Sequence, residues 1–251
     1  MSGDVERWPE GYARLVLDEV DSTMAEAARR APYISGPTWI MARRQVRGRG
    51  RQGRSWQDPP GNLAATLIFR PGCTAAEAAR RSFLAANALF ETLAIHIDRS
   101  ALSLKWPNDV LLDGGKVAGI LLECRGSGPF VDWLSIGIGV NLAGVPAGLG
   151  AQEFPPVSLA AASGEPPVDA ERFLTLLAGH YATEEGILAT FGFGRIREAW
   201  LRHAARLGER ITAKTGRETL EGWFETVDED GNLVLETDAG RRVIAAAEVH
   251  F

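Results

Sequence analysis

Six arginines and three glycines are concentrated in residues 43–54, RRQVRGRGRQGR. No acid interrupts them, although the formal charge of the whole chain is -5. Glycines let backbone N–H groups approach a ligand, and guanidinium groups donate paired hydrogen bonds to phosphate or carboxylate. The pattern predicts a small-anion site, with a solvated loop or a nonspecific RNA-binding stretch as alternatives. The small-anion site is favoured by the apolar strand that precedes this run and by Trp56, which follows it and is able to cover a base.

KWPND, residues 105–109, is a second group of polar side chains at the end of an apolar stretch. Pro107 cannot donate to a strand ladder, so the backbone is expected to be irregular there. Lys105 is then placed to meet a phosphate, and Asp109 to receive a metal ion or a hydroxyl group. A β-turn with Asn108 and Asp109 at favoured positions, and no ligand, is the alternative.

Two apolar strands with internal glycines follow, GGKVAGILLE (114–123) and IGIGVNL (136–142). Lys116 begins the first, where its charge suits a substrate anion, and Gly119 lies inside it, where glycine weakens packing unless something approaches closely. In the second, Gly137 and Gly139 share one face, and Asn141 follows on it. That cleared face suits a flat ligand such as a base. An ordinary hairpin with an exposed lysine, and tight packing of sheet on helix, are the alternatives.

Strands and helices are both needed to position these residues. Apolar and alternating patterns predict strands over 13–20, 38–45, 62–70, 101–112 with a break at Pro107, 116–124 and 131–142. Helical spacing and caps predict helices from Asp21 or Ser22, over 74–96 with Thr74 and Glu77 as a capping box, over 170–191 and over about 195–206. The Pro/Gly-rich residues 143–167 are expected to be a loop. The absence of regular βαβ alternation favours an α+β fold.

The pattern changes after Gly208. The segments ERITAKT, ETLEGWFETV, NLVLET and RRVIAAAEV are separated by the turns TGR, DEDGN and DAG. Short strands spaced by such turns predict a small β-barrel or β-sandwich. The sequence is therefore divided into domains at residues 1–206 and 207–251.

Composition excludes several classes of protein. The 251 residues are 45% hydrophobic and 24% charged, which is typical of a globular protein, and two cysteines are too few for a disulfide framework. The N-terminus has acids where a secretory signal needs a basic start, and no apolar run reaches the roughly 18–20 residues of a membrane span. The four histidines lack metal-ligand spacing, and Walker A, GxGxxG and GxSxG patterns are absent. A cytoplasmic location is expected.

The order of the motifs resembles the biotin–protein ligase family, the biotin–acetyl-CoA-carboxylase ligases. The likeness is carried by DSTM (21–24), Gln45 with GRGRQG (48–53) and Trp56, KWPND (105–109), GGKVAGILLE (114–123) and GIGVNL (137–142). The resemblance implies a mixed-sheet catalytic domain of the biotin/lipoate ligase type, followed by a small SH3-like β-barrel. It implies the monofunctional type without an N-terminal DNA-binding domain, because only about a dozen residues precede the first strand.

The resemblance also implies a reaction. Such ligases convert biotin and ATP, with Mg²⁺, into biotinoyl-5′-AMP and pyrophosphate, and transfer biotin to a lysine of a biotin carboxyl carrier domain. The attacking carboxylate and the α-phosphate are both anions, so the chemistry requires cationic groups that offset their repulsion. The arginines of residues 43–54 are thus expected to bind a carboxylate and a phosphate, and not a nucleic acid.

Positions that match the family's motifs give the expected site residues. Those implied for biotin are Ser22, Thr23, Gln45, Arg49, Gly50, Arg51, Lys116 and Gly119. Those implied for ATP and the adenylate are Arg49, Arg51, Trp56, Lys105, Asn108, Lys116 and Asn141. Those implied as catalytic are Arg51, Lys116, Lys105 and Asp109, with Asp109 also the Mg²⁺ ligand and a conceivable helper in deprotonating the acceptor lysine. Arg51 is expected to retain the adenylate under a closing loop. Met24 departs from the Asn of some relatives, so a polar contact is expected to be missing.

Two other functions compete with this one. Lipoate or octanoate ligases share the fold class and the carrier-lysine target, but the GRGRQG and KWPND segments disfavour them. A non-catalytic module that binds RNA or a protein would use the arginine run, but the apolar strand before that run disfavours it. By family analogy alone, one strand face is expected to serve homodimer formation and acceptor docking. Nucleic acid and membrane are not expected partners.

Overall fold

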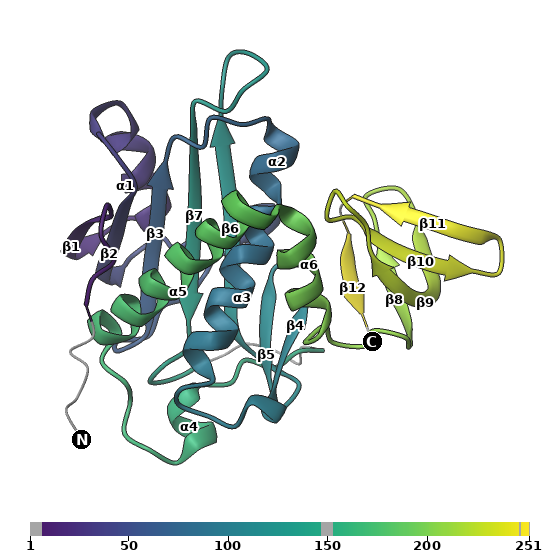
Figure 1. Cartoon of the computed structure of the whole chain (residues 1–251). Helices are drawn as coiled ribbons and strands as arrows, with labels where there is room; N and C mark the ends of the chain where they lie inside the picture. The colour runs from purple at the N-terminus through teal and green to yellow at the C-terminus, as the bar shows by residue number, and fades with distance from the viewer. Residues whose placement is uncertain (1–6, 147–152, 246, 251) are drawn as a thin grey trace.

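The computed structural model describes residues 7–146, 153–245 and 247–250, which form two sheets and the helices around them (Figure 1). The strands of the larger sheet are β1 (Ala13–Val20), β2 (Thr38–Gln45), β3 (Leu63–Phe69), β4 (Leu102–Lys105), β5 (Asp109–Leu112), β6 (Gly115–Arg125) and β7 (Trp133–Val140). The α-helices are α1 (Thr23–Arg30), α2 (Ala75–Ala79), α3 (Arg81–Leu93), α4 (Leu159–Ser163), α5 (Ala170–Phe191) and α6 (Phe193–Leu201). Three short 3₁₀ turns, η1 (Ala31–Tyr33), η2 (Arg51–Gly53) and η3 (Arg99–Ala101), complete this part of the chain. The mixture of elements confirms the expected α+β class.

The larger sheet is mixed, with seven strands in the order β1-β2-β3-β7-β6-β5-β4. Its β1 and β2 are parallel because α1 crosses between them, and every other neighbouring pair is antiparallel. The parallel pair places the start of α1, which follows β1, beside Gln45 at the end of β2. Two polar segments far apart in sequence thus meet at one edge of the sheet.

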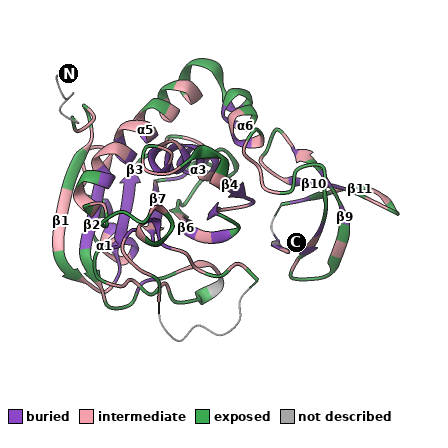
Figure 2. Ribbon diagram, turned by 90° about the horizontal axis from the view of Figure 1, so that it is seen from below, coloured by how far each residue is buried: buried purple, intermediate pink, exposed green. Residues whose placement is uncertain are grey.

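The two faces of this sheet are covered differently (Figures 1 and 2). Helices α3 and α5 cover one face, where alternate residues such as Trp39 and Met41 of β2 enter the main core. Trp39 meets Tyr181 of α5 edge-on, with ring centroids 6.0 Å apart. Ile40, which lies between Trp39 and Met41 in β2, points to the other face and packs in a small cluster with Ala27 of α1. Helix α1 covers only part of that second face, which leaves room there for a site.

Several predicted elements are confirmed and others are corrected. The helix predicted over 74–96 is wrong as a single element, since the chain bends at Arg80 and divides into α2 and α3. Thr74 does cap α2, with both hydrogen bonds of the capping box present. At α1, Ser22 has the extended backbone of an N-cap but makes no side-chain capping bond. The loop predicted over 143–167 contains the short helix α4, and residues 147–152 lie outside the described part of the chain.

The second sheet is antiparallel, in the order β11-β10-β9-β8-β12. Its strands are β8 (Arg210–Lys214), β9 (Thr219–Val227), β10 (Leu233–Thr237), β11 (Gly240–Ile244) and β12 (Glu248–His250). This sheet agrees with the expected small β module, and within the described residues its pairing runs from β11 to β12 without closing into a full barrel. We propose the division at residue 207 as the domain boundary, because it precedes β8.

The turn between β9 and β10 packs closely on the larger domain. Trp106 Nε1 donates to the Gly231 carbonyl at 3.0 Å, and Arg80 pairs with Asp230 at 2.7 Å. A Cβ atom on Gly231 would lie 2.8 Å from the Phe83 ring, and its φ of +88° also favours glycine. The turn sequence therefore fixes how the second sheet is seated. None of the described helices is long and apolar enough to cross a membrane.

Asp58, in the loop between Trp56 and β3, has a largely buried carboxyl group that is expected to affect the free energy of unfolding. Its Oδ1 atom is buried and has no hydrogen-bond partner among the described residues, and this burial raises the pKa of the carboxyl to about 6. A raised pKa means that the folded chain binds the proton more tightly than the unfolded chain. Between about pH 4 and 6 the free energy of unfolding therefore falls as pH rises, by up to about 3 kcal/mol from this group.

We expect Asp58→Asn to raise the free energy of unfolding by about 1–2 kcal/mol at pH 7.5 and to change it little at pH 4, because Asp58 is protonated there. Urea denaturation at both pH values measures this, with Asp238→Asn at an exposed turn as the matched control. Equal stability of the Asp58→Asn and parent proteins at pH 7.5 would contradict the assignment.

Candidate active site

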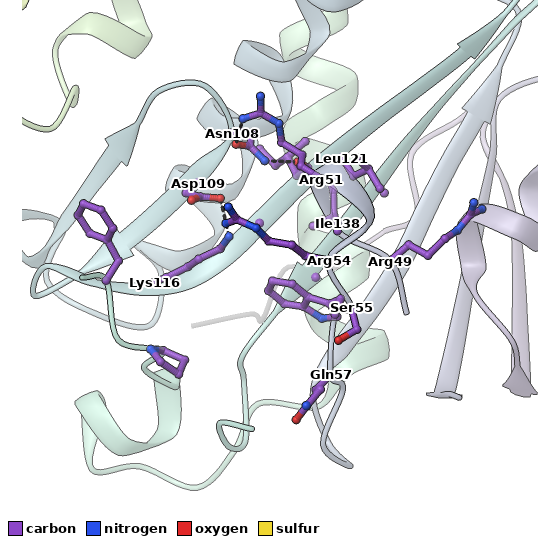
Figure 3. A pocket seen from close by; sticks show the side chains of 18 of the residues that line it. Arg49, Arg51, Arg54, Ser55, Gln57, Asn108, Asp109, Lys116, Leu121 and Ile138 are labelled. Carbon is purple, nitrogen blue, oxygen red and sulfur yellow. Dashed lines mark hydrogen bonds and ion pairs between the residues drawn. The ribbon is translucent and has the colours of Figure 1, made fainter. Parts of the chain in front are cut away.

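A cavity of about 580 Å³ opens on the sheet face that α1 leaves uncovered (Figure 3). It extends from the first residues of α1, past the Arg/Gly loop, KWPND and the glycines of β6 and β7, to β12. The volume is within the range of small-molecule sites. Every site residue predicted from the sequence lines this cavity: Ser22, Thr23, Gln45, Arg49, Gly50, Arg51, Trp56, Lys105, Asn108, Asp109, Lys116, Gly119 and Asn141.

One end of the cavity is polar and mostly buried. Ser22 and Thr23 are 2% and 3% exposed, and they face Gln45. The Gln45 Oε1 atom accepts hydrogen bonds from Thr23 N at 2.8 Å and Thr23 Oγ1 at 3.1 Å. The hydroxyl of Ser22 is buried with no partner in the described part of the chain. Since a buried hydroxyl without a partner is destabilising, this end is suited to a ligand that supplies hydrogen bonds.

The Arg/Gly loop folds back on itself and borders the cavity. Trp56 N donates to the Gly48 carbonyl at 2.9 Å, and Gly50 N donates to the Arg54 carbonyl at 2.7 Å. A Cβ atom on Gly48 would lie 2.3 Å from the Trp56 carbonyl, so only glycine fits. Arg51 leaves this loop and donates to Asn108 Oδ1 at 3.0 Å (Figure 3). The loop is thereby connected to KWPND across the cavity.

The KWPND segment forms the turn between β4 and β5, with a cis peptide bond between Trp106 and Pro107. Lys105 is 6% exposed, and its ammonium lies 4.5 Å from the centre of the Phe154 ring. Asn108 receives the bond from Arg51 and donates from Nδ2 to the Ile120 carbonyl at 2.6 Å, which fixes its orientation. Asp109 Oδ1 is 2.7 Å from Lys116 Nζ. The segment is therefore more than a β-turn, since its polar groups all face the cavity.

A β-bulge directs Lys116 into the cavity. Val110 of β5 pairs with Ala118 of β6, but the next residue, Leu111, pairs with Lys116, so Val117 is an extra residue. In a regular strand, Lys116 and Gly119 would point to opposite faces because they are three residues apart. The extra residue at Val117 moves the lysine onto the glycine face.

The glycines of β6 and β7 make room for the Trp56 ring, which lies against this face of the sheet. A Cβ atom on Gly139 would lie 2.4 Å from Trp56 Cε2, and one on Gly119 would lie 3.1 Å from Trp56 Cζ3. Lys116 Nζ is 5.6 Å from the centre of the same indole ring. Gly137 instead accommodates Met24, whose sulfur would lie 2.8 Å from a Cβ there. Gly137 and Gly139 thus share one face, as predicted, but Met24 of α1 packs on Gly137, which is the alternative of tight packing of sheet on helix.

Two predicted residues have geometry that limits what they can do. Asn141 is 2% exposed, and its Nδ2 donates to the Lys116 and Val157 carbonyls at 3.3 and 3.1 Å. Its amide therefore holds backbone next to the cavity. Arg49 is exposed, and its guanidinium is 3.7 Å from Glu123 of β6.

Residues near the far end were not identified from the sequence. His250 of β12 lines the cavity together with Val249, and its Nδ1 contacts the Glu153 carboxylate. Phe154, next in sequence, covers Lys105. The histidines carry no local motif. His250 comes close to the cavity through the tertiary structure, so no signal for it was present in the sequence.

The cavity is electropositive. Five cationic side chains line it, Arg49, Arg51, Arg54, Lys105 and Lys116, against the two carboxylates of Asp109 and Glu153. By contrast, Arg43 and Arg44 at the start of the arginine run lie outside it and pair with acids, at 2.7 Å to Asp18 and 2.5 Å to Glu19. Cationic side chains therefore outnumber carboxylates in the lining of this concave site, which suits a small anion with several charges. The described residues contain no group of three or more His, Cys, Asp or Glu side chains arranged to hold a metal ion.

Comparison with known proteins agrees with this arrangement. The sequence model of the biotin/lipoate A/B protein ligase family matches residues 16–141, and that of the biotin protein ligase C-terminal domain matches residues 207–251. A biotin–[acetyl-CoA-carboxylase] ligase from Paracoccus denitrificans is 53% identical over 94% of this chain and 99% of its own length. A bifunctional ligase/repressor from Bacillus subtilis is 30% identical over 94% of this chain and 74% of its own.

A solved structure is similar over nearly the whole fold. The biotin protein ligase from Aquifex aeolicus, in complex with biotin and ATP, superimposes with a TM-score of 0.79 at 25% identity, covering 94% of this chain and 97% of that one. The matched sequence models, the 53% identity and the shared fold lead to one conclusion. This chain belongs to the biotin/lipoate A/B protein ligase family.

Proposed function

We propose that the protein activates biotin with ATP to form biotinoyl-5′-AMP and then transfers biotin to a lysine of a biotin carboxyl carrier domain. The observation that carries the proposal is the arrangement of one cavity, with a buried polar end at Ser22, Thr23 and Gln45 and five cationic side chains beyond it. The Paracoccus relative is named for the same reaction on acetyl-CoA carboxylase, and the Aquifex structure holds biotin and ATP. The polar end suits the ureido ring, and the cationic part suits the carboxylate and phosphates.

In the first step, a biotin carboxylate oxygen attacks the α-phosphorus of ATP, and the bond from that phosphorus to pyrophosphate breaks. Lys116 and Arg51 are placed to reduce the repulsion between the two anions and to stabilise the charge on the phosphoryl oxygens. Asp109 orients the Lys116 ammonium at 2.7 Å. In the second step, the amine of the acceptor lysine attacks the acyl carbon, the bond to the phosphate oxygen breaks, AMP leaves and the amine loses a proton.

A Mg²⁺ ion fits this site as a companion of the nucleotide. Mg²⁺ is commonly bound by one or two carboxylates together with substrate phosphates and water. Asp109 is the carboxylate on the KWPND side of the cavity and would hold it. When bound, the ion neutralises negative charge on the phosphates.

The remaining assignments concern partners and location. We propose no nucleic-acid partner. Arg43 and Arg44 are paired with acids, and Arg49, Arg51 and Arg54 of the loop line a concave cavity. A homodimer is proposed by family analogy, with β1 as an available edge strand of the larger sheet. A cytoplasmic location is consistent with the two free cysteines, Cys73 and Cys124.

Mass spectrometry of the retained ligand tests the function. The protein is incubated with Mg²⁺-ATP and equal concentrations of biotin, lipoate and octanoate, then separated from free ligands. Biotinoyl-AMP is expected to remain bound. Retained lipoyl-AMP or octanoyl-AMP would overturn the substrate and keep the reaction type, and the absence of any adenylate would support a binding module instead.

A further inference from the structure

Three polar side chains form a chain of hydrogen bonds behind the polar end of the cavity. Thr66 Oγ1 is 2.8 Å from Thr23 Oγ1, which is 3.1 Å from Gln45 Oε1. Thr66 belongs to β3, is completely buried, and does not line the cavity. Its hydroxyl is therefore out of reach of a ligand, and any effect that it has on a ligand must act through Thr23.

Chemistry fixes the direction of every bond in this chain. The Thr23 backbone N–H can only donate, so the Gln45 group facing it at 2.8 Å must be the carbonyl oxygen. That oxygen can only accept, so the Thr23 hydroxyl donates to it. The Thr23 oxygen is then an acceptor for Thr66, whose hydroxyl donates. The bond from Thr66 thus helps to hold the Thr23 side chain with its proton directed at Gln45.

This direction decides what Gln45 offers to the cavity. With its oxygen held by two donors of Thr23, the amide must present Nε2, a donor, on its other side. A Cβ atom on Gly48 would lie 3.2 Å from this nitrogen, so the neighbouring glycine leaves space beside it. Ser22 Oγ, buried without a partner among the described residues, is a second group able to donate. The polar end is therefore arranged to donate to an acceptor such as the carbonyl oxygen of a cyclic urea.

We propose that Thr66 is a positioning residue that holds the Thr23 hydroxyl against Gln45, reinforces Gln45 as a donor and thereby favours a cyclic urea over an apolar ring of similar size. The inference rests on the proposed function and adds a determinant of substrate choice to it. An apolar dithiolane ring, as in lipoate, would offer no acceptor to the buried hydroxyl of Ser22 or to the half-buried amide of Gln45, which is unfavourable. Without the Thr66 hydroxyl, the Thr23 side chain is free to change rotamer, and Gln45 Oε1 is then held by the Thr23 backbone N–H alone.

Two matched pairs of variants test this. Thr66→Val keeps the shape and removes the hydroxyl, whereas Thr66→Ser keeps the hydroxyl and removes the methyl group. Thr66→Ala is the partner of Thr66→Ser, since these two differ only in the hydroxyl. Isothermal titration calorimetry gives the Kd of biotin without ATP, and competition gives the Kd of lipoate. The Kd of ATP is the control, and thermal unfolding shows that each variant is folded at the temperature used.

Thr66→Val is expected to raise the Kd of biotin by roughly 2–10-fold, the range for the net contribution of one hydrogen bond, and to leave the Kd of ATP unchanged. The preference for biotin over lipoate falls by a similar factor, and Thr66→Ser stays close to the parent. If Thr66→Val does not fold, the same difference is expected between Thr66→Ala and Thr66→Ser. Equal biotin affinity within each pair overturns the proposal while the proposed function stands. Failure of the parent protein to bind biotin defeats the proposed function itself.

Discussion

Replacing Lys116 by Met is expected to reduce the rate of adenylate formation by about 10²–10³-fold, the effect typical of removing one group that stabilises transition-state charge. The Lys116 ammonium lies between the Asp109 carboxylate, at 2.7 Å, and the Trp56 ring, at 5.6 Å, on the cavity face of β6. Its removal takes away a positive charge from the part of the cavity proposed for the phosphates and breaks the ion pair with Asp109, whose side chain is only 15% exposed. Pyrophosphate release in single-turnover experiments measures the rate.

The lysine content of the chain supplies the control for this prediction. Only three lysines are present, at positions 105, 116 and 214. Lys214 is exposed on β8 and lies outside the cavity, so Lys214→Met should leave adenylate formation unchanged. Full activity of Lys116→Met would show that the bulge on β6 serves only the structure.

The β-bulge at Val117 shows which part of the position of Lys116 can be predicted from the sequence and which part cannot. The sequence indicates that Lys116 begins an apolar strand near Gly119, which is correct. A regular strand would nevertheless place the two on opposite faces, and the extra residue at Val117 is seen only in the pairing with β5. The pairing is a property of two strands together, so a pattern within one strand does not contain it.

Thr66 and His250 were missed for a related reason. A threonine inside the apolar strand LAATLIF is an ordinary residue for a strand, and its hydroxyl matters only because α1 brings Thr23 within 2.8 Å. His250 lies 97 residues from Glu153, and the contact exists because the second sheet is seated beside the cavity. Local motifs therefore predicted the groups that line the cavity, whereas the groups that orient them depend on how the elements pack.

Arg51 illustrates a contact that the sequence could suggest but not define. The Arg/Gly run predicted an anion site, and the structure connects this loop to KWPND through Arg51 Nη1 and Asn108 Oδ1 at 3.0 Å. Asn108 is itself held by the Ile120 carbonyl at 2.6 Å, so the loop is connected to a fixed point on β6. The connection joins two residues that line the cavity, so we expect it to slow the release of a bound adenylate.

Replacing Arg51 by Gly is therefore expected to accelerate loss of the adenylate by about 10–100-fold, the range for a hydrogen bond to a charged group. Gel filtration followed by mass spectrometry measures the fraction of adenylate retained with time. Arg47→Gly adds the same flexible residue to the same loop, but Arg47 lies outside the cavity, so retention should stay at the parent value. Arg51→Lys keeps the charge without the paired donors of the guanidinium and should be intermediate. Equal loss from Arg47→Gly and Arg51→Gly would assign the effect to loop flexibility, whereas loss from Arg51→Gly alone would assign it to the side chain that spans the cavity.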